Sequence, residues 1–378
     1  MPRLTPVECA ERAVDLAQVA YDAGTFAIGG ILLDKTGNVL KEIHNNVVRE
    51  GKISDPTAHA ERQLISWYYE QIHRGVSLPP PSELRIVTSL DPCLMCAGAI
   101  LECGINVIVV AYDDIGGVNW ARDGQFVAVP PTIWSAAFKQ IAYFGLDDGT
   151  RWYAGVCSSM FENALIPASI VQRSFELART SLDNVRKIVH PDRATDVNGT
   201  PVPADPTAIR ALLKYYDGAF CFEADIGQPK HRALLLDKMV EVAKDSEANG
   251  GYFDSAALVD PRSNVLLILG SAPLPSSKID TPLMSLARTY ATCRRNSLQD
   301  SLPHPSQCKV VLLYGPGPDA LGMMDMGAFG LTLGRSENPQ ELFYFRKRQS
   351  EAQLRRMVEN MPPLFRDDMK ITPKWLGA

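Results

Sequence analysis

The spacing of apolar residues over residues 1–115 changes repeatedly between that of an amphipathic helix and that of a buried strand. A helix is indicated where apolar residues recur every three or four positions, and Gly24 marks the end of the first one. Short runs of β-branched and aromatic residues between turn residues indicate strands. The pattern predicts helices over residues 8–21, 58–70 and 93–102, and strands over residues 26–33, 39–43, 85–89 and 106–112. In the second of these helices, Asp55 or Thr57 is expected to act as the N-cap.

The region between the halves of the chain has a different character. Residues 161–189 carry apolar residues at helical spacing and predict one or two helices. Residues 192–206 contain Pro201, Pro203 and Pro206, which is typical of a loop or linker.

The second half of the chain repeats the pattern of the first. Residues 13–40 align without a gap on residues 239–266, so that Gly24 falls on Gly250 and Asp34 on Asp260. Farther along, residues 85–87 align on residues 309–311. A recurrence of helix, hairpin, helix and strand at nearly constant spacing predicts an internal duplication. The alternative is an unrelated α/β domain whose element order happens to match.

Length and composition narrow the class of protein. A chain of 378 residues is too long for one ordinary core and predicts two domains, and 46% hydrophobic residues suffice for both. A net charge of −5 favours a small-molecule partner over a broad phosphate-binding surface, although a local basic groove for nucleic acid stays open. The eight cysteines include one Cys-x-x-Cys pair and no secretory leader precedes them, which predicts a reducing, cytoplasmic location. No apolar run approaches the roughly 18 residues of a membrane span.

Candidate chemistry gathers in two short segments, His59-Ala60-Glu61 and Pro92-Cys93-Leu94-Met95-Cys96. A His and a Cys-x-x-Cys pair supply three ligands that zinc prefers and leave a fourth coordination position for water. Glu61 then stands where it can handle the protons of that water. A structural zinc site usually has four protein ligands, and the sequence shows no suitably spaced fourth. The pattern therefore predicts a catalytic site, with a structural zinc as the alternative.

The predicted elements place these ligands at the starts of two helices. His59 opens one helix, while Cys93 and Cys96 share one face of the first turn of the other. Free backbone N–H groups and the helix dipole at these positions lower thiol pKa values, which favours the thiolates that zinc needs. Cys103 lies about 10 Å farther along the same helix, at roughly 1.5 Å per residue, and is predicted to be a core residue.

Residues 55–61, Asp-Pro-Thr-Ala-His-Ala-Glu, and residues 92–99, Pro-Cys-Leu-Met-Cys-Ala-Gly-Ala, resemble the cytosine, guanine and tRNA-adenosine branch of the cytidine deaminase superfamily. The resemblance covers roughly residues 8–120. It implies a three-layer α/β/α sandwich with a mixed five-stranded sheet, and Zn²⁺ held by His59, Cys93 and Cys96. It also implies that Glu61 takes a proton from the bound water and passes it to the substrate ring and the departing amine.

The resemblance also suggests substrate contacts. Asn45 falls where nucleobase deaminases of this branch use an Asn to hold the base; alternatively it only caps a turn. Glu102 stands where relatives often have a ring against the base, and some relatives use an acid near Asp114. The full set of expected substrate contacts is Asn45, Ala60, Asp91, Glu102 and Asp114.

In this alignment the second half lacks the metal ligands. His59 and Glu61 fall on Ser285 and Ala287, and the two cysteines fall on Gly317 and Ala320. We therefore predict a zinc-dependent deaminase domain over residues 1–160, a helical connector and Pro-rich linker over residues 161–230, and a degenerate deaminase-like domain over residues 231–378. The degenerate copy is expected to serve as an intramolecular partner, which makes a pseudo-dimer, and a homodimer of the chain stays open.

The expected activity is hydrolytic deamination of an amino-substituted nucleobase or related heterocycle of the guanine or cytosine type, with release of ammonia. Two alternatives remain open at this point. One is a tRNA adenosine deaminase with its inactive partner fused to it, and the other is a non-catalytic scaffold that binds zinc.

Overall fold

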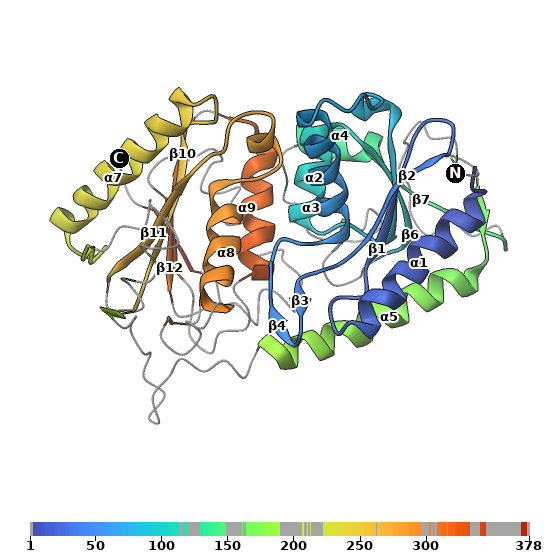
Figure 1. Ribbon diagram of the computed structural model, residues 1–378, viewed down its shortest axis with the longest axis horizontal. Coiled ribbons are helices and arrows are strands. Elements are labelled where there is room, and N and C mark those ends of the chain that lie inside the picture. The colour runs from blue at the N-terminus through green and yellow to red at the C-terminus, as the bar shows by residue number, and fades with distance from the viewer. Residues whose placement is uncertain are drawn as a thin grey trace.

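Two mixed five-stranded sheets lie side by side in the described part of the chain, with helices between them and on their outer faces (Figure 1). The computed structural model describes residues 3–112, 117–118, 129, 131–148, 161, 164–189, 206–207, 210, 212, 222–261, 263–295, 302–303, 305, 308–315, 317–332, 341–344 and 372–375. No helix within these residues is both long and apolar enough to cross a membrane.

The first sheet has the strand order β2-β1-β5-β6-β7. Its strands are β1 (Gly29–Leu33), β2 (Val39–His44), β5 (Arg85–Leu90), β6 (Asn106–Ala111) and β7 (Ile141–Tyr143). The β1 strand runs antiparallel to both of its neighbours, whereas β5, β6 and β7 run parallel to one another. Every residue of β1 and β5 is buried, because helices cover both faces of the sheet. The mixed α/β sheet predicted from the sequence is confirmed.

Helices on the inner face of this sheet carry the candidate site. They are α2 (Ala60–His73) and α3 (Leu94–Cys103), and α4 (Pro131–Gln140) packs beside α3. The outer face is covered by α1 (Pro6–Asp22) and α5 (Ala168–Val189) (Figure 1). A capping box explains why α1 begins before the predicted residue 8: Glu8 N donates to Thr5 Oγ1 at 3.3 Å, and Thr5 N donates to Glu8 Oε2 at 2.7 Å.

The position of α5 differs from our expectation of a connector. Ser174 Oγ donates to the carbonyl of Ser89 at 2.6 Å, and Ser181 Oγ accepts from Ala27 N at 2.8 Å. These hydrogen bonds attach α5 to the first sheet, so this part of residues 161–230 belongs to the outer layer of the first unit. The Pro-rich linker that we predicted over residues 192–206 lies outside the described residues, apart from its last position.

Short elements complete the first half. A hairpin of β3 (Val48–Arg49) and β4 (Lys52–Ile53) precedes α2, and a short helical turn, η1 (Pro81–Glu83), precedes β5. A parallel pair of β8 (Gly145–Leu146) and β9 (Leu165–Ile166) lies just before α5.

The second sheet has the order β11-β10-β12-β13-β14 and the same pairing senses as the first. Its strands are β10 (Asp254–Val259), β11 (Val265–Gly270), β12 (Lys309–Tyr314), β13 (Glu341–Tyr344) and β14 (Thr372–Trp375). An outer helix, α7 (Pro229–Ala248), covers one face (Figure 1). The inner face carries α8 (Pro282–Cys293), which follows a short turn η3 (Ser276–Lys278), and α9 (Asp319–Thr332).

Strand register agrees with the sequence alignment of the two halves. The pairing of β1 with β2 shifts between Leu32 and Leu33, and the pairing of β10 with β11 shifts between the aligned residues Leu258 and Val259. Leu32 lies opposite Ile86 on β5, and Leu258 lies opposite the aligned Val310 on β12.

The two halves meet through their inner helices, α2 and α3 on one side and α8 and α9 on the other (Figure 1). Buried side chains of all four helices belong to one apolar core. The α3 and α9 helices pack antiparallel and closely: a Cβ on Gly98 would lie 2.8 Å from the carbonyl oxygen of Ala320, and a Cβ on Gly327 would lie 2.2 Å from Met95 N. Each helix therefore uses a glycine to let the backbone of the other approach.

Candidate metal centre and active site

The three candidate ligands stand at the N-terminal ends of α2 and α3. His59 is the N-cap residue of α2, Cys93 is the N-cap residue of α3, and Cys96 lies one turn later. Our prediction that Asp55 or Thr57 caps α2 is wrong. Thr57 N and Thr57 Oγ1 instead both donate to Asp55 Oδ1, at 2.8 and 2.7 Å, which forms a tight turn ahead of His59.

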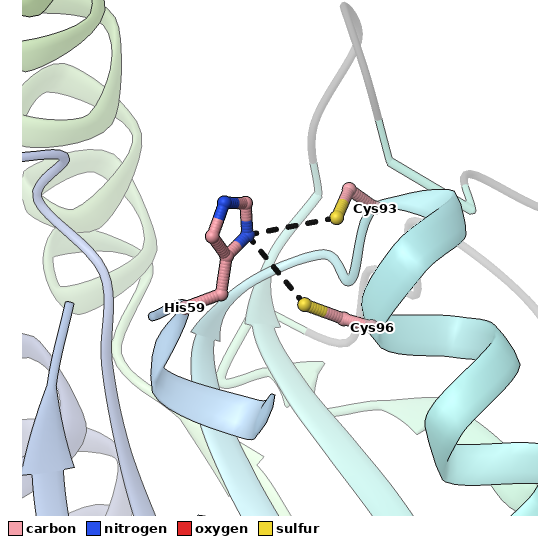
Figure 2. A group of neighbouring side chains, drawn as sticks. All are labelled: His59, Cys93 and Cys96. Atoms are coloured by element: carbon pink, nitrogen blue, oxygen red, sulfur yellow. Dashed lines mark hydrogen bonds between the residues drawn. The ribbon is translucent and has the colours of Figure 1, made fainter. Parts of the chain in front are cut away.

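The distances between the ligand atoms suit zinc (Figure 2). His59 Nδ1 lies 3.6 Å from the sulfur of Cys93 and 3.6 Å from the sulfur of Cys96. Bond lengths of about 2.0–2.1 Å to nitrogen and about 2.3 Å to sulfur, at the tetrahedral angle, separate such a pair of atoms by about 3.6 Å. All three donor atoms lie within 4.8 Å of one another, and the described residues contain no second such cluster. The residues therefore fit a zinc ion with three protein ligands.

Hydrogen bonding and burial shift the pKa values of the two thiols in opposite directions. A hydrogen bond from Cys96 lowers the pKa of Cys93, and the charge of His59 lowers it further. Burial raises the pKa of Cys96, so Cys96 holds its proton more tightly than Cys93 does. Because a metal ion competes with protons for thiolates, binding of zinc here is expected to release protons.

Glu61 lies beside this cluster and is 1% exposed. Its Oε1 accepts a hydrogen bond from Thr88 Oγ1 at 2.7 Å, while its Oε2 lies 3.5 Å from the sulfur of Cys96. Burial raises the pKa of Glu61, and the hydrogen bond from Thr88 opposes that rise. One carboxylate oxygen is thus held by β5 and the other faces the ligands.

Thr88 is a residue that our reading of the sequence missed. It is fully buried in the middle of β5, and its hydroxyl also lies 3.0 Å from the carbonyl of Leu90. A hydroxyl within an otherwise apolar, fully buried strand was the available signal, because a buried polar group needs a partner.

Asn45 is fully buried next to the turn that leads to His59. Its Oδ1 accepts hydrogen bonds from Thr25 Oγ1 at 2.7 Å and from Val47 N at 2.9 Å. Its Nδ2 has no partner among the described residues. The side chain therefore stabilises a turn through its oxygen and keeps a donor free. The next residue, Asn46, donates from its backbone N to the carbonyl of Ala58 at 2.9 Å.

The other expected substrate contacts are placed differently. Ala60 is fully buried at the start of α2. Asp91 is 3% exposed and accepts a hydrogen bond from Tyr143 at 2.8 Å. Glu102 lies in the last turn of α3, at the end opposite to Cys93; burial raises the pKa of Tyr69, and the charge of Glu102 adds to that rise. Asp114 lies outside the described residues. An aromatic side chain that we did not predict, Phe26, has its ring centroid 6.2 Å from that of His59.

Comparison with known proteins agrees with this geometry. A family model described as "Cytidine and deoxycytidylate deaminase zinc-binding region" matches residues 6–112. A tRNA-specific adenosine deaminase of Haemophilus influenzae is 33% identical over 102 residues, which are 27% of this chain and 55% of that protein. A guanine deaminase of Bacillus subtilis is 29% identical over 117 residues, which are 31% of this chain and 70% of that protein.

Among solved structures, one from a study of A-to-I editing by tRNA:A34 deaminases is 30% identical. It covers 33% of this chain and 89% of that chain, with a TM-score of 0.28. The chain spans only 55% of the length of the Haemophilus influenzae relative. Residues 6–112, which hold the His59, Cys93 and Cys96 cluster, thus form a zinc-binding region of the cytidine and deoxycytidylate deaminase type.

Proposed function

We propose that this chain deaminates an amino-substituted nucleobase or a related heterocycle of the guanine or cytosine type by hydrolysis and releases ammonia. The observation that carries the proposal is the pairing of a three-donor zinc site with the Glu61 carboxylate, whose Oε2 lies 3.5 Å from a ligand sulfur. A structural zinc site would have a fourth protein ligand, and the described residues offer none in this cluster.

Zinc, when bound, supplies the positive charge that lowers the pKa of water from 15.7 towards about 7. Glu61 is the group that moves protons: it passes one proton of the water to the ring nitrogen, and then passes the second, from the hydroxyl group formed on the carbon, to the departing amine. The water oxygen bonds to the carbon that bears the amine, the C–N bond breaks, and ammonia leaves. Burial suits Glu61 to this exchange because its raised pKa brings the neutral and charged forms closer in free energy.

Asn45 supports a substrate that carries a hydrogen-bond acceptor. Its free Nδ2 is a buried hydrogen-bond donor, and the backbone N of the next residue, Asn46, donates to the carbonyl of Ala58, directly before His59. A buried donor without a partner costs free energy, which a substrate acceptor would offset. The carbonyl oxygen of guanine or cytosine can accept this hydrogen bond, and so can a ring nitrogen of adenine.

A tRNA adenosine deaminase with a fused inactive partner is the second candidate. The similarity to a tRNA-specific adenosine deaminase favours it, at 33% identity over 102 residues. The net charge of −5 favours the small substrate, because tRNA binding depends on neutralising phosphates.

We further propose that residues 231–378 are a second copy of the deaminase fold that has lost its metal ligands. The shared strand order and the matching register shifts support this proposal. So does the turn after each first strand. Asn38 N donates to Asp34 Oδ1 at 3.0 Å, and the aligned Asn264 N donates to Asp260 Oδ1 at 2.8 Å. The side-chain amides of both Asn residues donate to the second oxygens of the same carboxylates, at 2.9 and 3.0 Å.

A panel assay tests the proposed activity. The purified, zinc-loaded chain is mixed with guanine, cytosine, adenine, their nucleosides, pterins, triazines and tRNA, and ammonia is measured. We expect release from a free base with a ring carbonyl. Ammonia from tRNA alone would favour the second candidate, and ammonia from no member of the panel would leave a zinc-binding scaffold.

Glu61→Gln tests the mechanism in the same assay. We expect the variant to keep zinc and to lose about 10²–10⁴-fold in kcat, the usual contribution of a general acid–base group. Glu70→Gln, which changes an exposed carboxylate of the same helix, is the matched control and is expected to retain wild-type turnover. Full turnover by Glu61→Gln would remove Glu61 from the mechanism.

A further inference from the structure

The second half of the chain contacts the segment that carries His59 and Glu61 on both sides of these residues. Ahead of His59, Arg288 Nη1 of α8 donates to Thr57 Oγ1 at 3.3 Å, and Arg295 donates to Ser54 Oγ. Directly after Glu61, the guanidinium of Arg62 donates to the carbonyl of Ile279. Polar contacts from the second half thus reach residues on both sides of the metal ligand His59.

Asp280 joins these contacts into one network. Its Oδ1 lies 3.7 Å from Arg62 Nη2 and accepts from Arg288 Nη1 at 3.3 Å, while its Oδ2 accepts from Arg288 Nη2. The Arg62 side chain is 3% exposed, so its charge has been removed from water. A buried cation is tolerated only with a partner, and Asp280 is a carboxylate supplied for it by the other half.

The second-half residue aligned with His59 takes part in the same network. Ser285 Oγ donates to Asp280 Oδ2 at 3.2 Å and also accepts from Arg288 Nη2 at 3.2 Å. Ser285, which stands in the second half where His59 stands in the first, therefore helps to hold the Asp280 carboxylate that contacts the first half.

The location of His59 gives this network a consequence for the metal. His59 is the N-cap residue of α2 with no side-chain capping bond, and its backbone N donates to the carbonyl of Thr57 at 2.8 Å. A shift of Thr57 would therefore shift the ligand. Residues that orient metal ligands from a second layer typically change metal affinity by about 10–100-fold when they are replaced.

We propose that Asp280 and Arg288 are positioning residues for the metal centre: they hold Thr57 on one side and Arg62 on the other, and so fix the segment that presents His59 and Glu61. The second half thereby stabilises the zinc site directly, in addition to packing against the first half. The inference rests on the zinc site of the proposed function but not on any particular substrate.

The test is the rate at which the full-length, zinc-loaded chain releases zinc to a chelator, measured below the onset of unfolding seen by circular dichroism. We expect Arg288→Met to release zinc several-fold faster than the wild type, and Asp280→Asn about 10-fold faster or more. Arg173→Met is the matched control, because Arg173 is an exposed arginine in an ion pair with Asp15 at 2.9 Å on the outer layer. Its release rate is expected to equal that of the wild type.

A double-mutant cycle of Arg288→Met with Thr57→Val assigns the effect to the contact between the two side chains. The combined variant is expected to release zinc more slowly than the product of the two single effects predicts, since both changes remove one shared contact. If Asp280→Asn does not fold, Arg288→Met and the cycle decide the question.

The proposal is overturned if Arg288→Met releases zinc at the same rate as Arg173→Met, or if the cycle shows independent effects. Zinc release needs no substrate, so this outcome is distinct from failure of the proposed deamination. If the panel assay identifies a substrate, we expect Arg288→Met and Asp280→Asn to lower kcat with little change in KM, because the network holds Glu61 and the metal ligand.

Discussion

The two halves of this chain have sheets of the same strand order, but among the described residues only the first half has a cluster that could hold a metal ion. Both sheets share strand order, pairing sense and the position of the register shift. They differ at the starts of the inner helices, where the first half has His59, Cys93 and Cys96. The two halves can therefore share a sheet topology while the chemistry depends on a few side chains that the sheet and its helices carry.

The two halves also differ at a buried strand residue that contacts Glu61 in the first half. On β5, Thr88 gives a hydrogen bond to Glu61, while the aligned position on β12 is the fully apolar Leu312. The second half therefore has neither the carboxylate nor its hydroxyl partner. An apolar side chain at this buried position needs no hydrogen-bond partner, so Leu312 suits a half that has Ala287 in the place of Glu61.

The largest expected effect of a substitution is on metal content. We expect one zinc ion per chain, and we expect Cys96→Ser to abolish it, because two remaining ligands bind zinc weakly. Cys293→Ala, which removes a buried thiol of α8, is the control and is expected to keep the full zinc content. Elemental analysis of the purified variants measures both. Two zinc ions per chain, or zinc lost from the Cys293 variant, would contradict the assignment to the first half.

Gly327→Ala tests the close contact between the halves and is expected to have the next largest effect. The added methyl group would lie 2.2 Å from Met95 N, and the backbone there cannot move aside without shifting α3. Overpacking of this kind typically costs about 1–3 kcal/mol of unfolding free energy, and we expect a value in the upper part of that range. Denaturant unfolding measures it. At the exposed Gly227 the same change would meet only the Asp225 side chain, at 3.2 Å, and should be nearly neutral.

Thr88→Val gives β5 an apolar residue at the position where β12 has one, and so removes the hydroxyl partner of Glu61. We expect kcat to fall about 10-fold, which corresponds to about 1.4 kcal/mol and to one lost hydrogen bond to a charged group. Zinc content and KM should stay close to those of the wild type, since Thr88 contacts Glu61 and not a ligand. Thr88→Ser keeps the hydroxyl and should recover most of the activity. Equal losses in the Val and Ser variants would show that packing, and not the hydroxyl, matters.

The smallest expected effect concerns the two matching turns. Gly37 has a φ of 89°, and the aligned Ser263 has a φ of 70°, in the left-handed region that favours glycine. We expect Ser263→Gly to raise, and Gly37→Ser to lower, the free energy of unfolding by up to about 1 kcal/mol each. Thermal unfolding at constant zinc measures both. Shifts of the same sign would show that the two turns are not equivalent.

Much of the first half could be predicted from the sequence because its signals are local. Apolar periodicity located α1, α2, α3 and the strands β1, β2, β5 and β6, and ligand spacing located the zinc cluster, whereas α4 and β7 were not predicted. The N-cap of α2 was predicted wrongly because Asp55 and Thr57 satisfy each other in a turn, which leaves His59 as the first residue beside the helix. A capping preference could not show that this competing hydrogen bond exists.

Contacts between distant segments were not predictable in the same way. The hydroxyl of Thr88 faces Glu61 only because β5 lies beneath α2, and Arg288 reaches Thr57 only because the halves pack together. The role of α5 was missed for a similar reason: its bonds to Ala27 and Ser89 join residues that are far apart in the chain. Sequence periodicity reports which face of an element is apolar but not which neighbour covers it.

The glycine contact between α3 and α9 joins surfaces that belong to a single polypeptide. Tethering turns their encounter into an intramolecular event with an effective concentration typically in the millimolar range, so dilution does not separate them. Specific activity should accordingly stay constant from micromolar to picomolar enzyme. A cell that makes this chain also makes both surfaces in equal amounts, with no unmatched subunit left to be degraded.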